Sequence, residues 1–143
     1  MTQEDKDLVL KDLCARLPYG VWAEAKLITS ASSTSWLVDA LLIHSFKRGR
    51  FDFYKPYIFP LSSVTEEQAI ELFNIFGISL VDSVGANYIK VNEVTGITFF
   101  FQNGFDVETH LDKLINWLNK NHFDWRGLIP KGLANDATGL NIY

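Results

Sequence analysis

The order in which helical and strand-like patterns follow one another is the feature that most restricts the fold of this chain. Apolar residues recur at three- and four-residue spacing in three segments, which predicts amphipathic helices over residues 3–17, 65–76 and 106–119. Pro18 and Gly20 end the first helix. Thr65 and Gln68 have the spacing of a capping box, in which each side chain binds the other residue's backbone amide at the start of the second helix.

Short segments with alternating or continuous apolar residues lie between these helices. They predict β-strands over residues 21–30, 36–46, 51–57, 79–82, 88–92 and 97–101. A turn over residues 47–50 connects the second and third strands, and Gly49 is the residue there that suits a positive φ. Residues 94–96 predict the turn of a hairpin. Pro56 has no backbone N–H, so we expect the third strand to end or to lie at an edge of the sheet there.

Groups of strands between segregated helices favour an α+β fold over a parallel doubly wound sheet. A length of 143 residues is that of one ordinary domain, and 48% of the residues are hydrophobic, which is enough for an independent core. We therefore predict one α+β domain over residues 1–143, with three helices, an antiparallel sheet of five to six short strands and an irregular, docked C-terminal segment. Leu140 and Ile142 are the residues expected to dock its end.

The charge and the cysteine content describe an ordinary soluble chain. A net charge of −4 gives the whole protein no attraction to nucleic acid or to anionic membranes. Cys14 is the single cysteine, which favours a reducing compartment, and on the apolar face of the first helix its thiol is expected to be inert. The acidic N-terminus does not resemble a signal peptide, and no segment approaches the ~20 apolar residues of a membrane helix. We expect a cytoplasmic protein that makes no membrane contact.

The densest group of chemically distinctive side chains lies between Trp117 and Arg126. His122, Asp124 and Arg126 alternate along the chain, so an extended backbone would direct all three to one side. They could then serve a hydrolase or transferase, with His122 as general base and Arg126 holding an anion. The structural alternative, which we favour, pairs Asp124 with Arg126 and places a partly cationic His122 at the end of the last helix.

A second group combines a basic turn with the aromatic residues that follow it: Lys47, Arg48, Arg50, Phe51, Phe53 and Tyr57. Cations interleaved with aromatic rings bind single-stranded nucleic acid through phosphate contacts and base stacking. A basic turn also protects a sheet edge from unwanted pairing, and the aromatic positions fit a core face equally well. Nucleic acid is therefore the alternative partner and not the leading one.

No metal site and no cofactor site is predicted. Cys14, His44, His110 and His122 lack the spacing of zinc ligands, and the chain has no glycine-rich phosphate loop.

Three stretches of the chain carry a family resemblance. They read LVLKDLCARLPYGV at residues 8–21, KPYIFPLSSVTEEQ at residues 55–68, and WLNKNHFDWRGLIPKGLA at residues 117–134, with the ending DATGLNIY at residues 136–143. Together they resemble an uncharacterised family of small proteins from gut Bacteroidetes and their phages or mobile elements. The resemblance implies an accessory role linked to a phage or mobile element, and it supplies no catalytic residues.

The leading hypothesis is a small cytoplasmic binding or adaptor protein without catalytic activity, because no strong catalytic or metal motif accompanies the aromatic-rich C-terminal segment. Its partner would be another protein, and the residues expected to contact it are Trp117, His122, Asp124, Trp125 and Arg126. The nucleic-acid protein and the hydrolase or transferase are the alternatives. The oligomeric state stays open.

Overall fold

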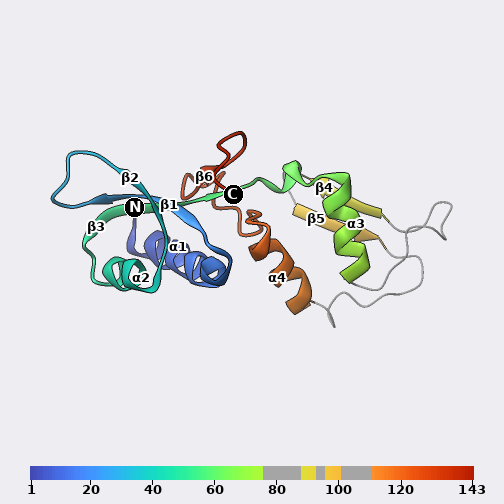
Figure 1. Ribbon diagram of the computed structural model, residues 1–143, viewed down its shortest axis with the longest axis horizontal. Helices are drawn as coiled ribbons and strands as arrows, with labels where there is room; N and C mark the ends of the chain where they lie inside the picture. The colour runs from blue at the N-terminus through green and yellow to red at the C-terminus, as the bar shows by residue number, and fades with distance from the viewer. Residues whose placement is uncertain (76–87, 93–95, 101–110) are drawn as a thin grey trace.

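The structure is a computed structural model that describes residues 1–75, 88–92, 96–100 and 111–143. Its α-helices are α1 (Gln3–Arg16), α2 (Ala40–Lys47), α3 (Glu66–Ile75) and α4 (Leu111–Lys120). Its strands are β1 (Trp22–Leu27), β2 (Thr34–Leu37), β3 (Phe51–Ile58), β4 (Tyr88–Asn92), β5 (Gly96–Phe100) and β6 (Asn135–Asp136). Two 3-10 helices, η1 (Leu17–Tyr19) and η2 (Leu61–Ser63), follow α1 and β3 (Figure 1). Within the described ranges no helix has both the length and the apolar character needed to cross a bilayer.

The main sheet has four strands in the order β2-β1-β3-β6. β1 pairs antiparallel with both β2 and β3, and β6 adds a two-residue parallel pairing at the end of β3. β4 and β5 form a separate antiparallel hairpin. The mixture of helices and strands is confirmed, but the main sheet has four strands, and not five to six. The predicted strand over residues 79–82 and the turn residues 94–95 lie outside the described residues.

The prediction of one strand over residues 36–46 is wrong, because Asp39 begins a helix inside this apolar run. Its Oδ1 accepts the backbone N–H of Leu42 at 2.7 Å and caps α2. Ile43 and Phe46, three residues apart, are the buried side chains of this helix. Since α2 separates β2 from β3, the two strands pair on opposite sides of β1, and β1 becomes a middle strand.

Several local predictions can be compared with the structure directly. The capping box is confirmed: the backbone N–H of Thr65 donates to Gln68 Oε1 at 2.9 Å, and that of Gln68 donates to Thr65 Oγ1 at 3.3 Å. Gly49 has the expected positive φ, +66°. Pro56 does not end β3, which continues to Ile58, but at Pro56 the strand pairs with β1 alone, since β6 pairs only with Tyr57 and Ile58.

The buried face of α1 differs from the one that its apolar spacing predicts. Val9, Asp12, Leu13 and Arg16 are fully buried, and these positions form one face of a helix. Cys14 lies beside this face and is exposed, so the prediction of an inert thiol on the apolar face is wrong. The helix therefore buries two charged side chains and leaves its thiol in water.

Two apolar clusters fill the described part of the molecule. The first lies between α1, α2 and the main sheet and includes Leu13, Phe46 and Ile58. The second lies between α3 and α4 and consists of Leu72, Leu114, Trp117, Leu118 and Phe123. Residues 121–134, which we name the clasp segment, reach both clusters, because Phe123 belongs to the second and Leu128 to the first. Figure 1 shows α4 and the chain that follows it between the two halves of the molecule.

Candidate functional site

The clasp segment begins with a sharp change of backbone direction after α4. His122 has a φ of +58°, a conformation that few residues other than glycine adopt. The chain then runs beside Phe59: the backbone N–H of Phe59 donates to the carbonyl of His122, and the N–H of Asp124 donates to the carbonyl of Phe59, both at 2.8 Å. This pairing ties the clasp segment to the chain just beyond β3.

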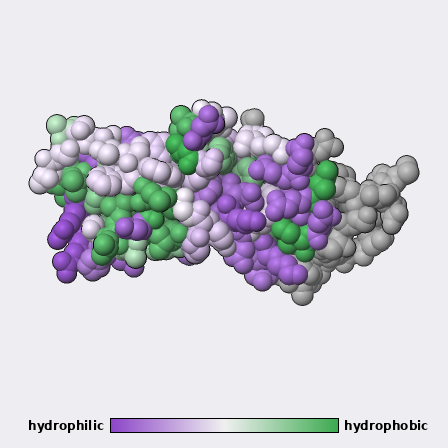
Figure 2. All heavy atoms as spheres, viewed as in Figure 1, coloured by the Kyte–Doolittle hydropathy of each residue, from purple (hydrophilic) through white to green (hydrophobic). Residues whose placement is uncertain are grey.

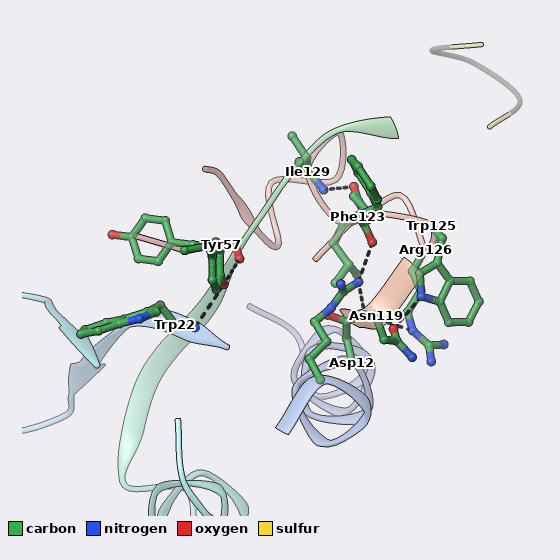
Figure 3. A network of polar contacts seen from close by, with 12 residues as sticks. Asp12, Trp22, Tyr57, Asn119, Phe123, Trp125, Arg126 and Ile129 are labelled. Atoms are coloured by element: carbon green, nitrogen blue, oxygen red, sulfur yellow. Dashed lines mark hydrogen bonds and ion pairs between the residues drawn. The ribbon is translucent and has the colours of Figure 1, made fainter. Parts of the chain in front are cut away.

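A buried ion pair on α1 holds the clasp segment from the other side (Figure 3). Arg16 Nε and Nη2 donate to the two carboxylate oxygens of Asp12 at 2.7 and 3.0 Å, one helical turn away. Arg16 Nη2 also donates to the carbonyl of Phe123 at 2.8 Å, and Arg126 Nε donates to Asp12 Oδ1 at 3.2 Å. Two cations and one carboxylate therefore join the N-terminal helix to residues more than a hundred positions away.

Asp124 serves the backbone of its own segment. Its two carboxylate oxygens accept the N–H groups of Leu128 and Ile129, both at 2.8 Å. The expected pair of Asp124 with Arg126 is wrong, because the arginine reaches Asp12 instead. The turn at residues 124–129 presents two backbone amides to the Asp124 carboxylate. Two such charge-assisted hydrogen bonds compete well with an arginine for the same carboxylate.

His122 is buried, and its ring stacks on Tyr143 with 3.8 Å between the ring centroids and 14° between the planes. Loss of hydration lowers the pKa of His122 to about 4, and the positive charge of Arg16 acts in the same direction. The imidazole is therefore neutral at pH 7. The prediction of a partly cationic ring at the end of the last helix is wrong, because burial outweighs the backbone of Tyr19 and the charge of Asp12, which both raise the pKa of His122.

Tyr143 docks the end of the chain on the main sheet. Its hydroxyl donates to the carbonyl of Tyr57 at 2.6 Å and accepts the backbone N–H of Trp22 at 3.1 Å (Figure 3). The expectation of a docked tail is confirmed. The expected contact of Leu140 is wrong, since that side chain is exposed, whereas Ile142 is half-buried.

The two tryptophans of this region have different environments. Trp117 is buried and stacks on Phe123, with the ring centroids 5.5 Å apart. Trp125 is half-buried; its indole N–H donates to Asn119 Oδ1 at 2.9 Å, and the Arg126 guanidinium lies 4.0 Å from its ring centroid. Both rings mainly stabilise the junction between α4 and the clasp segment.

His122, Asp124 and Arg126 therefore do not share one open site. The imidazole stacks on Tyr143, the carboxylate binds two backbone amides, and the guanidinium lies between Asp12 and Trp125. General base catalysis needs a base within hydrogen-bonding reach of a substrate proton, and none of these contacts offers that reach. The arrangement fastens the chain, and its chemistry is that of a structural clasp.

The structure separates the basic turn from the first aromatic residue predicted to act with it. Lys47, Arg48 and Arg50 are exposed, but Phe51 is buried edge-to-face against Phe46, with 4.8 Å between the ring centroids. Phe53 and Tyr57 are half-buried, and both alternate with the buried residues of β3. Lys55 Nζ lies 5.9 Å from the Phe53 ring centroid, which leaves one cation–aromatic pair on this strand. A stacking platform beside the three cations would need Phe51 to leave the core.

Metal ligands do not gather in the described ranges: no three His, Cys, Asp or Glu side chains there come close enough to hold an ion.

The residues that sequence reasoning missed are those that the clasp segment contacts: Asp12, Arg16, Asn119 and Tyr143. One signal for the first two was present, because Asp12 and Arg16 have the i, i+4 spacing of a helical ion pair and flank the buried Leu13. Nothing in the local pattern indicates that this pair is buried or that Phe123 lies above it.

Acidification is expected to destabilise the protein through His122. The unfolded chain binds a proton on this side chain near its ordinary pKa of 6.5, whereas the folded protein does so only near 4. The stability that the neutral ring contributes is therefore complete above pH 6.5 and is lost as the pH falls towards 4. At pH 5 the loss should be about 2 kcal/mol in the free energy of unfolding.

Urea unfolding at pH 7.5 and at pH 5, compared between the wild type and His122→Phe, isolates this effect from the carboxylates that titrate in the same range. The phenylalanine retains an aromatic ring for Tyr143 and cannot titrate. The wild type should lose about 2 kcal/mol more than the variant between the two pH values. An equal loss in both proteins would show that His122 titrates normally in the fold.

Comparison of the chain with protein-family models, with curated proteins and with solved structures found no match. The resemblance of the three sequence stretches to a family from gut Bacteroidetes and their phages therefore stays a prediction.

Proposed function

We propose that this protein is a non-catalytic binding module that recognises an extended segment of another protein along the edge strand β2. The observation that carries the proposal is the unprotected edge of the main sheet. β2 is the first strand in the order β2-β1-β3-β6, and it pairs with β1 alone among the described residues. All four of its residues are exposed. Its outward backbone groups are therefore available to an added strand.

The chemistry of this edge favours pairing with another chain. Natural edge strands are usually protected by lysine, proline or inward-pointing charge. Residues 28–38 contain no charged residue and no proline. Trp36 and Leu37 are 43% and 53% exposed, and adjacent residues of a strand point to opposite faces. An added strand would find an apolar side chain above and below the edge.

Leu41, at the start of α2 and four residues after Leu37, is a further exposed apolar side chain. It is 77% exposed, more than any other large apolar side chain among the described residues. Figure 2 shows apolar atoms gathered on the end of the molecule that carries α1, α2 and β2, whereas the surface around α3 and α4 is mainly hydrophilic. We name Thr34–Leu37 together with Leu41 the β2 edge patch.

The size of the β2 edge patch favours a peptide segment over a second copy of the chain. A stable dimer needs about 800 Å² of surface per partner, and a four-residue edge with three large apolar side chains supplies much less. An extended segment of a partner gains backbone hydrogen bonds and places alternate apolar residues on Trp36 and Leu37. Its affinity should be modest, with a Kd of about 10–100 μM. The absence of cations at this edge makes nucleic acid the weaker candidate.

Selection of displayed random dodecamer peptides on the immobilised full-length protein tests the proposal. Peptides that alternate apolar and polar residues should be enriched, and fluorescence polarisation should give their affinities. Leu37→Lys should weaken binding at least tenfold, because it places a charge beside the added strand. Leu140→Lys is the matched control: this leucine is 48% exposed, lies in the C-terminal tail, and its replacement should change the Kd less than twofold.

Results of two kinds, in peptide binding and in sedimentation, would overturn the proposal. The first is the absence of any strand-forming peptide after selection, or an equal loss of binding in Leu37→Lys and Leu140→Lys. The second is a concentration-dependent dimer in sedimentation that Leu37→Lys dissociates, which would identify a second copy as the occupant of the edge.

A further inference from the structure

A pocket of about 270 Å³ lies between η1, α3 and α4, away from the β2 edge patch. Its lining residues are Tyr19, Ile75, Lys113, Asn116, Trp117 and Lys120. Four of them come from α4 at positions i, i+3, i+4 and i+7, and these positions form one face of a helix. The pocket is therefore built on one rigid element, with one residue each from η1 and α3 facing it.

The charge of the pocket is positive in a protein whose net charge is −4. Lys113 and Lys120 line it, and none of the lining residues in the described part of the chain is acidic. The nearest ion-pair partner is Glu71, whose Oε1 lies 3.9 Å from Lys120 Nζ. Both of these side chains are largely exposed, and exposed pairs of this length contribute little. An anion that enters the pocket can therefore replace this contact at small cost.

The indole of Trp117 provides an independent sign of a ligand. This side chain is 3% exposed, and its Nε1–H has no hydrogen-bond partner among the described residues. The equivalent group of Trp125 donates to Asn119. A buried donor without an acceptor costs about 1–3 kcal/mol, so such groups are uncommon in folded proteins. Trp117 lines the pocket, and because its Nε1 atom is closed to solvent, an acceptor oxygen of a ligand would reach this donor after a small movement of the ring.

The apolar part of the lining suits a flat ring. Tyr19 and Ile75 are 38% and 37% exposed, so part of each side chain remains accessible to a ligand. Ligand pockets have volumes of about 300–1,000 Å³, and 270 Å³ lies just below this range. This volume admits one ring system with one anionic group. It excludes a dinucleotide.

We propose that this pocket binds a small aromatic anion, with its ring between Tyr19 and Ile75 and its carboxylate or phosphate at Lys113 and Lys120. Asn116 and the indole N–H of Trp117 supply neutral donors to the same oxygens. The proposal goes beyond the β2 edge patch and does not depend on it, because the pocket and the patch share no residue.

Titration of the 15N-labelled full chain with indole-3-acetate and with adenosine monophosphate tests the proposal and separates the two anion types. The chain has four tryptophans, and Trp117→Phe assigns the indole signal of Trp117. A saturable shift of that signal is expected with at least one probe, with a Kd of about 0.1–1 mM. Indole-3-acetamide, which is uncharged, should bind at least tenfold more weakly than indole-3-acetate.

Lysine variants test whether the shift of the Trp117 indole signal arises from binding in the pocket. Lys113→Gln combined with Lys120→Gln should weaken binding at least tenfold, whereas Lys131→Gln, an exposed lysine outside the pocket, should leave it unchanged. Both lysines are exposed, so the double variant should fold normally. Equal binding of the acetamide, unchanged binding in the double variant, or no shift with either probe at 5 mM would each overturn the proposal.

Discussion

Replacing Asp12 by alanine is expected to lower the free energy of unfolding by about 3–5 kcal/mol, the largest effect of any single substitution proposed for this protein. The reason is the positive charge of Arg16, which would remain in the protein without its carboxylate partner. Arg16 is completely buried and would lose both of its carboxylate contacts, and Arg126 would lose its single one. A buried guanidinium without a counter-charge is far less stable than one in water, so the clasp segment should detach or the fold should open.

Urea unfolding followed by circular dichroism measures this loss. Asp7→Ala provides a matched control on the same helix, because Asp7 is exposed and its carboxylate accepts a hydrogen bond from the exposed side chain of Gln3; its cost should stay below about 0.5 kcal/mol. Asp12→Leu combined with Arg16→Met should be more stable than Asp12→Ala, since it removes carboxylate and guanidinium together. A loss below about 1 kcal/mol in Asp12→Ala would show that water reaches Arg16 and that the pair is not buried.

Asp124→Ala is expected to lower the free energy of unfolding by about 3 kcal/mol, because it removes two charge-assisted hydrogen bonds at once. The N–H groups of Leu128 and Ile129 would then have no acceptor, and Leu128 is completely buried. Asp124→Asn retains one acceptor oxygen and should lose about half as much. Thermal unfolding of the three proteins at pH 7.5 gives the comparison.

Asp136 offers a control of the same chemistry in an exposed position. Its carboxylate accepts one backbone N–H, that of Thr138, at 2.8 Å, and water can replace it there. Asp136→Ala should cost less than about 1 kcal/mol. If Asp124→Ala and Asp136→Ala were equally mild, the turn at residues 124–129 would hold its shape without the carboxylate.

These expectations change where function should be sought. The side chains that the sequence presents as a candidate site are largely occupied by contacts within the fold, and the accessible chemistry lies elsewhere. The β2 edge patch and the pocket on α4 lie on different elements, and the ligands proposed for them differ: an extended protein segment and a small anion. A substitution in the clasp segment would damage both indirectly, through stability, so loss of function in such a variant would not locate a site.

Local sequence signals predicted the elements whose ends are marked by side chains close in sequence. The Thr65–Gln68 capping box and the positive φ of Gly49 follow from contacts within a few residues, and both are confirmed, although Gly49 follows helix α2 and not the predicted strand. Residues 36–46 show the limit of this reasoning. An apolar run of this length fits a buried strand and a buried helix equally well, and the choice between them depends on Asp39, whose capping role is a single hydrogen bond.

The partners within the clasp could not be predicted, because they join positions that are distant in sequence. Asp124 and Arg126 are two residues apart, and nothing local indicates that Arg126 prefers a carboxylate on α1. The pKa of His122 depends in the same way on burial under Tyr143 and on the charge of Arg16. Sequence spacing therefore identified His122, Asp124 and Arg126 as distinctive residues but predicted the wrong contacts for them.

The clasp also sets an order of events during synthesis. Arg126 follows Asp12 by 114 positions, so at about 5–20 residues per second the ribosome adds it about 6–23 s later. Once residue 58 has been added, α1, α2 and the first three strands are made, while the carbonyl of Phe123 that Arg16 binds does not yet exist. Until Phe123 is added, Arg16 lacks this contact, and we expect water to hydrate its guanidinium on the helix face that the finished fold buries.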